Sequence, residues 1–457
     1  MMRDPNIIFI LCDDLGWGDL SCYGQQTLKT PNLDKLAEEG IRFTNFYTTS
    51  PVCSPARASI MTGLHSGHLP IRELTDPYLP DELWNMAKMF RKAGYVSSCL
   101  GKYGVGKGQH HDDPIRKGFD GHYGYNCMGH AHNYFPPFLI ENGKKVFLKN
   151  RPPEGDYYQW TTGIGVAEVK EEYTPDLIEE KALRFIEENR NHPFFLYYCT
   201  NLPHANNEGW VPNNPEKQTA DGMEVDDYGE FADKPWSDNE KGFARMIQRI
   251  DQAVGKVVEK VKELGLEKDT IIFFSSDNGP HNEGGHQVTT FNSAGPFQGF
   301  KRSLHEGGIR VPFIAWSPER IPGNRVTDEL AYFPDLIETF TELAGLIPVH
   351  YSDGHSLVPL LTGNEGKQPK HPYLYFEFMG QIAVRRGDFK YFRDKEGEEA
   401  LYNIADDVHE DHDIKDKYPE IFEELKAYIK REHVDYRPLP IPDGEASLVS
   451  KMRKRRR

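Results

Sequence analysis

Asn6-Ile7-Ile8-Phe9-Ile10-Leu11-Cys12-Asp13-Asp14 is an apolar run that ends abruptly in two carboxylates. Residues 193–199 and 270–274 are equally apolar, and they too lead directly into polar residues. Runs that are apolar on both faces are typical of central strands in a parallel sheet covered by helices on both sides. Open sheets of this kind bind ligands beyond the carboxyl ends of their strands. The sequence therefore predicts an α/β fold with its functional site at this edge.

Periodic apolar patterns between these runs predict helices at residues 33–39, 81–92, 175–189, 239–264 and 330–343. Beyond about residue 365 the pattern changes to short strands at hairpin spacing (373–378, 382–386, 389–392 and 400–404), followed by a helix at 419–431. We expect three parts: an N-terminal catalytic domain (1–364), a small C-terminal antiparallel sheet with one helix (365–445), and a basic, disordered tail (446–457).

The composition restricts the partners of this 457-residue chain, whose formal net charge is −16. Such a surface repels nucleic acid, so an anionic substrate needs a local positive pocket. No apolar run is long enough to span a membrane, and no export signal precedes the first strand. We expect a cytoplasmic protein, or a periplasmic or secreted one if the sequence is a trimmed mature form. Six scattered cysteines fit neither a disulfide scaffold nor a zinc pair.

Polar residues at two of the strand ends suit a metal ion. Asp13 and Asp14 follow the first run, and Asp277 and Asn278 follow the third. Hard cations such as Ca²⁺ and Mg²⁺ take oxygen ligands of this kind. Adjacent aspartates in a regular strand point to opposite faces, so both can bind one ion only if the strand has ended there. Each pair alone would be read as turn chemistry, whereas the two pairs together predict a divalent cation site.

Cys53-Ser54-Pro55-Ala56-Arg57 stands out among the cysteine-containing stretches, because it lies on a loop rich in Ser, Thr and Pro. Lys102 lies among glycines after another strand-like run, in a pattern that is not a P-loop. Lys301 precedes a second Gly-rich turn, and His204 follows Pro203 at the end of the second apolar run. Alone, either lysine would be read as a surface residue.

In this order and spacing, these motifs resemble the type I, formylglycine-dependent sulfatases, a family of arylsulfatases and bacterial carbohydrate sulfatases. The resemblance covers the chain from Asn6 to about Val311, and the small C-terminal part also fits. It implies an alkaline-phosphatase-like sandwich, in which helices flank a large, mostly parallel central sheet. It also implies a maturation partner, the formylglycine-generating enzyme that oxidises the cysteine of the motif.

The resemblance further implies a role for each motif residue. As formylglycine hydrate, Cys53 would be the nucleophile, and it would share a divalent cation with four oxygen ligands. That cation is usually Ca²⁺, with Mg²⁺ as the alternative. Arg57 would steady the hydrate, Lys102 and Lys301 would hold the sulfate oxygens, and His204 would stand near the leaving-group oxygen. The ion ligands would be Asp13, Asp14, Asp277 and Asn278. Fixed positive groups of this kind stabilise the charge that develops as a sulfate ester breaks.

One position departs from the family pattern. Many members have a histidine two positions after the lysine of the Gly-Lys motif, where it acts on the second hydroxyl of the hydrate. This chain has Gly104 there, which can transfer no proton. The replacement candidates are His281 and either His130 or His132, and we expect His281→Ala or His132→Ala to stall turnover.

The favoured function is a sulfuric ester hydrolase acting on a sulfated sugar or glycan. The His130-Ala131-His132-Asn133-Tyr134 segment resembles that of bacterial carbohydrate sulfatases and favours galactose or N-acetylgalactosamine units. Two alternatives stay open at this point. One is a phosphate or phosphonate ester hydrolase on the same scaffold, which rates on aryl sulfate and aryl phosphate would distinguish. The other is a non-catalytic glycan-binding relative, which would keep Cys53 as an unmodified thiol.

Overall fold

Strand β1 (Asn6–Cys12) lies inside a ten-stranded sheet, and all seven of its side chains are buried. The computed structural model describes residues 4–74, 78–105, 113–348 and 351–435, so the expected tail at 446–457 lies outside the described residues. Within the described residues, no helix is both long and apolar enough to cross a bilayer.

The sheet is mixed, with a parallel centre. Parallel pairing joins β9, β1, β8, β4 and β5, so these strands end at the same edge, whereas β10, β6 and β7 pair antiparallel. The order across the sheet is β11 (Arg325–Thr327), β2 (Ile41–Phe43), β10 (Phe313–Trp316), β9 (Thr270–Ser276), β1, β8 (Phe194–Cys199), β4 (Val96–Gly101), β5 (Gly121–Gly124), β6 (Phe138–Glu141) and β7 (Lys144–Phe147).

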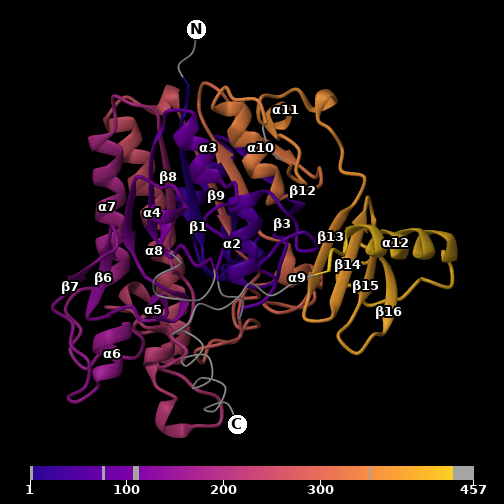
Figure 1. Ribbon diagram of the computed structural model, residues 1–457. Helices are drawn as coiled ribbons and strands as arrows, with labels where there is room; N and C mark the ends of the chain where they lie inside the picture. The colour runs from indigo at the N-terminus through magenta and orange to yellow at the C-terminus, as the bar shows by residue number, and fades with distance from the viewer. Residues whose placement is uncertain (1–3, 75–77, 106–112, 349–350, 436–457) are drawn as a thin grey trace.

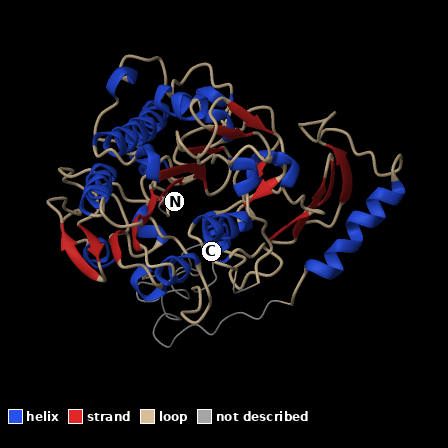
Figure 2. Ribbon diagram, turned by 90° about the horizontal axis from the view of Figure 1, so that it is seen from above, coloured by secondary structure: helices blue, strands red, loops and turns tan. Residues whose placement is uncertain are grey.

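Helices cover both faces of this sheet (Figures 1 and 2). Alternate β1 side chains enter two separate cores, with Ile8 and Ile10 in one and Ile7 and Phe9 in the other. The first core includes α1 (Pro31–Glu38), α7 (Thr174–Glu188) and α8 (Asp238–Glu263); the second includes α2 (Cys53–Thr62), α3 (Met86–Lys92), α10 (Pro334–Leu343) and α11 (Val358–Leu361). The expected sandwich of helices around a mostly parallel sheet is confirmed.

Two predicted helices begin four or more residues later than expected. The helix predicted at 81–92 starts at Met86, because the Asn85 side chain accepts a hydrogen bond from the Lys88 amide and caps it. The helix predicted at 330–343 starts at Pro334, because β12 (Ala331–Tyr332) first pairs with β3 (Phe46–Tyr47). The helix predicted at 175–189 begins one residue earlier, at Thr174, and ends at Glu188.

The placement of the cysteine motif on a loop was also wrong. Cys53 is the first residue of α2, and the whole pentapeptide lies in the first two turns of this buried helix. Pro55 fits there because the first amides of a helix have no partner within the helix. The N-terminus of a helix favours negative charge, so this position suits a residue that handles an anion.

A four-stranded antiparallel sheet follows in the C-terminal part, at the right of Figure 1. Its strands are β13 (Leu374–Phe378), β14 (Gln381–Arg386), β15 (Phe389–Arg393) and β16 (Glu399–Asn403). Helix α12 (Pro419–Glu432) packs on one face through Phe422 and Leu425. The other face packs on the N-terminal part, where Phe376 and Phe392 join Tyr47 and Ile309 in one core.

A buried charge cluster joins the two parts around α9 (Glu306–Ile309). Glu306 contacts Arg310 at 2.6 Å, Arg385 of β14 at 3.1 Å and Lys390 of β15 at 3.0 Å, and all four side chains are buried. Burial raises the pKa of Glu306, but Lys390, Arg310 and Arg385 outweigh burial and hold that pKa well below its usual value. The carboxylate is therefore a charged link between the two sheets.

We predict that Glu306→Gln lowers the free energy of unfolding by about 3–5 kcal/mol, because it leaves buried cations without their partner. The folded pKa of Glu306 lies below the unfolded value of about 4.3. This stabilisation is therefore present at neutral pH, and it is lost as the pH falls from about 4 towards the folded pKa. Denaturant unfolding at several pH values measures both effects.

The matched control is Glu424→Gln, which removes a carboxylate from an exposed pair with Arg386. Exposed pairs contribute at most about 1 kcal/mol, so this variant should unfold almost as the parent does. Equal losses of unfolding free energy in the two variants would contradict the assignment of Glu306 as a charged link. A loss in Glu306→Gln that persists unchanged at acid pH would contradict it as well.

Candidate active site

The carboxyl ends of β1 and β9 bring three carboxylates together. Asp13 and Asp14 follow β1, and Asp14 has a φ of 68°, so the chain leaves the strand geometry there and both carboxylates can face one point. The Asp14 amide donates to Asp277 Oδ1 at 3.1 Å, and Asn278 Nδ2 donates to Asp14 Oδ1 at 2.7 Å. One oxygen from each aspartate lies within 4.8 Å of the other two.

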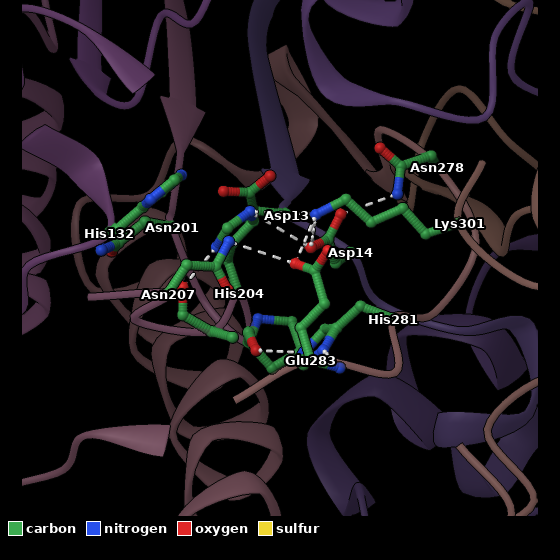
Figure 3. A network of polar contacts seen from close by, with 12 residues as sticks. Asp13, Asp14, His132, Asn201, His204, Asn207, Asn278, His281, Glu283 and Lys301 are labelled. Carbon is green, nitrogen blue, oxygen red and sulfur yellow. Dashed lines mark hydrogen bonds and ion pairs between the residues drawn. The ribbon is translucent and has the colours of Figure 1, made fainter. Parts of the chain in front are cut away.

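Three buried cations face these carboxylates. Arg57 Nε donates to Asp277 Oδ2 at 2.8 Å, Lys102 Nζ lies 2.6 Å from Asp13 Oδ2, and Lys301 Nζ lies 2.7 Å from Asp14 Oδ2. The lysines come from the ends of other segments, since Lys102 follows β4 and Lys301 precedes α9. Figure 3 shows Lys301 beside Asp14. Three buried negative charges therefore meet three positive ones, and a divalent cation would leave the site net positive.

The site has oxygen atoms that suit such a cation. Asp13 Oδ1 and Asn278 Oδ1 are buried and accept no hydrogen bond from the described residues. Unsatisfied buried acceptors are costly, and hard cations bind carboxylate and amide oxygens. Burial raises the pKa of Asp277 to about 7, since the lowering by Arg57 is smaller than the combined effect of burial, Asp13 and Asp14. A cation between these groups would relieve their repulsion, so the four predicted ligands fit a divalent ion.

Cys53 lies beside this cluster. Its sulfur and one ligand atom each from Asp13 and His204 lie within 4.8 Å of one another, and the side chain is buried. Burial raises the pKa of the Cys53 thiol to about 11, despite the nearby Lys102. The encoded cysteine is therefore a neutral thiol at pH 7, which is a poor nucleophile.

His204 is held between two partners. Its Nδ1 lies 2.7 Å from the Ala205 carbonyl and donates to it, so Nε2 is left to accept from Lys301 Nζ at 3.1 Å. Burial and the Lys301 charge hold the pKa of His204 well below its usual value. His204 is thus neutral in this state, and Lys301 holds the proton between the two side chains.

Comparison with known protein families identifies the family to which this chain and its site belong. The family model described as Sulfatase matches residues 5–346, and the model described as N-sulphoglucosamine sulphohydrolase, C-terminal, matches residues 295–435. This chain belongs to the sulfatase family. It is therefore a sulfuric ester hydrolase, as the sequence motifs predict.

Its relatives include two kinds of animal sulfatase. The chain is 32% identical to N-acetylgalactosamine-6-sulfatase of Canis lupus familiaris, over 85% of this chain and 71% of the relative. It is 31% identical to arylsulfatase A of Homo sapiens, over 85% and 74%. The sulfatase also resembles the crystal structure of Ps i-CgsB in complex with k-i-k-neocarrahexaose, with a TM-score of 0.76, 26% identity and coverage of 98% and 97%.

The departure at Gly104 has a physical reason in this sulfatase. Gly104 has a φ of 66°, and a Cβ there would lie 3.0 Å from Arg57 Cδ. Arg57 is fully buried beneath it, and its NH1 group donates to the Lys102 carbonyl. A side chain at position 104 would therefore press on the arginine that holds Asp277. The residue would also have to adopt a backbone conformation that favours glycine.

The three histidine candidates have different surroundings. His132 stacks on His204 with ring centroids 4.5 Å apart, and its Nδ1 lies 3.4 Å from Glu208. His281 is also near the site, but Nε2 donates to the Pro203 carbonyl at 3.0 Å and Nδ1 accepts from the Glu283 amide at 3.1 Å. His130 is buried with both ring nitrogens bound to Asn126 and Phe138. Only His132 keeps a ring nitrogen without a backbone partner among these described contacts.

Glu283 belongs to the same network, although sequence reasoning did not select it. Its Oε2 lies 3.1 Å from Lys301 Nζ and accepts from Asn207 Nδ2 at 3.3 Å (Figure 3). Its Oε1 pairs with Arg302. The only signal in the sequence is its position two residues after His281, in a Gly-rich turn. If Asp14 turns towards a cation, Glu283 stays as the carboxylate that holds Lys301.

Added Ca²⁺ should raise the midpoint temperature of thermal unfolding, because a ligand that binds only the native state stabilises it. At a Ca²⁺ concentration a hundredfold above Kd, the free energy of unfolding rises by about 2.7 kcal/mol. Asn278→Ala should weaken this response, since it removes one oxygen ligand without changing the charge. Asn150→Ala, which alters a buried asparagine hydrogen-bonded to Pro136, should keep the response. An equal shift in Asn278→Ala, or the same shift with K⁺ at matched ionic strength, would argue against the ion site.

Glu283→Ala should lower kcat on an aryl sulfate by about 10²-fold, the usual effect of removing or misplacing one electrostatic group. Glu283→Gln should retain more activity, because its amide oxygen still accepts from Lys301. Arg302→Ala removes a different partner of Glu283, the one on Oε1, and should change kcat little. Steady-state kinetics of the three variants decide the point, and a loss in Arg302→Ala as large as in Glu283→Ala would contradict it.

Proposed function

We propose that this sulfatase removes sulfate from a sulfated carbohydrate, with Cys53 converted to formylglycine and a divalent cation, most simply Ca²⁺, held by the two acidic pairs. The main support for this proposal is the position of Cys53 at the start of α2, beside an electrically balanced set of buried carboxylates and cations. Formylglycine supplies a hydrated aldehyde that attacks sulfur and later expels sulfate. A formylglycine-generating enzyme is the maturation partner that this proposal requires.

The residues of the chain have separate tasks in this reaction. With the carboxylates bound to an ion, Lys102 and Lys301 are free to take the sulfate oxygens, and Arg57 remains on Asp277. The first amides of α2 add positive potential at the same point. The proton shared by Lys301 Nζ and His204 Nε2 is the one we propose for transfer to the leaving-group oxygen. His132, rather than His281, is the proposed base in place of the missing histidine, because both nitrogens of His281 are bound.

The proposal of a carbohydrate substrate rests on two supports. One animal relative is named N-acetylgalactosamine-6-sulfatase, and the similar structure of Ps i-CgsB was solved in complex with k-i-k-neocarrahexaose. In addition, His132 belongs to the wall segment 130–134 that forms one side of the site, next to the His204 ring. Galactose or N-acetylgalactosamine units are the proposed sulfated residues.

Cys53→Ala should abolish turnover of an aryl sulfate, by at least about 10³-fold, because loss of the nucleophile removes the covalent route. Peptide mass spectrometry of the parent chain should show position 53 as an aldehyde instead of a thiol. Cys22→Ala, at a half-buried free cysteine elsewhere, should keep full activity. The aryl phosphate rate should be much lower than the aryl sulfate rate. A faster phosphate rate, or an unmodified thiol in active protein, would overturn the proposal.

A further inference from the structure

Exposed aromatic side chains gather on one short stretch of this chain. Of the six Phe, Tyr and Trp side chains that are exposed in the described residues, four lie between positions 147 and 160. Tyr157 is 79% exposed and Trp160 38% on helix α6 (Tyr157–Thr162), and Phe147 is 65% exposed at the end of β7. Residues three apart on a helix lie on the same side, so Tyr157 and Trp160 form one surface.

Phe147 faces the same helix. Lys145 Nζ donates to the Thr161 carbonyl of α6 at 2.7 Å, so this face of β7 is turned towards α6. Phe147 is two residues further along the strand, and side chains two apart share a face. The three rings of Phe147, Tyr157 and Trp160 are named here the α6 platform.

The α6 platform is firmly held from below. Asp156 caps α6 by accepting from the Gln159 amide at 3.0 Å, and Gln159 and Thr162 are buried on its inner side. The Gly163 carbonyl that ends the helix accepts from Asn133 Nδ2 at 2.9 Å. Because the helix is held in this way, its rings project from a fixed backbone, which lowers the conformational cost of binding.

The α6 platform is linked to the candidate active site by hydrogen bonds of two buried asparagines, Asn133 and Asn206. Asn133 follows His132, whose ring stacks on His204, and Asn206 Nδ2 donates to the Gly165 carbonyl just beyond α6 at 3.2 Å. The path from Trp160 to His132 spans on the order of 10 Å. Helix α6 also lies at the same end of the sheet as α5 (Met128–Ala131) and α9 in Figure 1.

We propose that the α6 platform binds sugar rings next to the sulfated unit, so the substrate is an oligosaccharide or polysaccharide and not a single sulfated sugar. This inference rests on the proposed function and extends it. The apolar C–H face of a sugar stacks on an aromatic ring, while the Tyr157 hydroxyl and the Trp160 N–H remain for its hydroxyl groups. Charge on this side is mixed, because exposed Lys144 and Lys149 are accompanied by exposed Glu168 and Glu171, so the rings carry the recognition.

The test compares kcat/KM for an aryl sulfate with that for sulfated galactose, N-acetylgalactosamine and glucosamine, each as monosaccharide and as oligosaccharide. The parent chain should prefer the oligosaccharide of its sugar. The double variant Tyr157→Ala/Trp160→Ala should lose about tenfold or more on that oligosaccharide, because two stacking contacts are removed. Its rate on the aryl sulfate, which has no sugar ring, should stay within about twofold of the parent rate.

Two matched variants distinguish the loss of ring stacking from a general effect of the substitutions on the fold. Tyr157→Phe keeps the ring and should keep most of the oligosaccharide preference. Tyr351→Ala removes a ring that is 70% exposed between α10 and α11, and it should change neither rate. No preference for oligosaccharide over monosaccharide in the parent chain, or an unchanged preference in the double variant, would overturn the inference.

Calorimetric binding of the same oligosaccharides to the Cys53→Ala chain provides a readout without turnover. Weaker binding in the platform double variant would support the α6 platform even if the parent cleaved no sulfate ester, a result that would overturn only the proposed function. Sedimentation velocity tests the other occupant, a second copy of this chain. A change of oligomeric state in the double variant, with glycan affinity unchanged, would overturn the glycan assignment.

Discussion

The balance between three buried carboxylates and three buried cations is the constraint on which the rest of this structure depends. Each aspartate of the set has a lysine or arginine within 2.8 Å. Unpaired charges in such surroundings would destabilise the fold by several kcal/mol each. Under the proposed function the same pairing would also prepare the chemistry, because a divalent cation bound by the carboxylates would free positive groups for an anionic substrate. The same six side chains would then provide stability without the ion and affinity for sulfate with it.

The fold supplies this balance through strand direction. Because β9, β1, β8 and β4 are parallel, residues that are far apart in the sequence arrive at one edge, and α2 starts there with Cys53. The C-terminal sheet supports the same region from the side. The Lys301–Arg302 turn is held by Gln381 of β14, and Glu306 links α9 to β14 and β15. The small sheet is therefore part of the support for Lys301.

The strands and most of the site could be predicted from sequence, because apolar runs and the residues that end them are local signals. Asp13, Asp277 and Lys102 all follow directly from such runs. Glu283 and the α6 platform could not be found in this way. Glu283 matters only through Lys301 and Arg302, and a six-residue helix such as α6 leaves too short a pattern. The helix starts at Met86 and Pro334 were missed for a similar reason, since the Asn85 cap sets the first and the pairing of β12 with β3 sets the second.

A crystal structure of the protein grown with Ca²⁺ tests the central claim most directly. The account predicts one ion bound by Asp13, Asp14, Asp277 and Asn278, in contact with the two oxygens that accept no hydrogen bond in the present structure. It also predicts that Lys102 and Lys301 turn away from the aspartates towards the side chain at position 53. Lysine–aspartate pairs that persist in saturating Ca²⁺, with no ion between the acidic pairs, would contradict it.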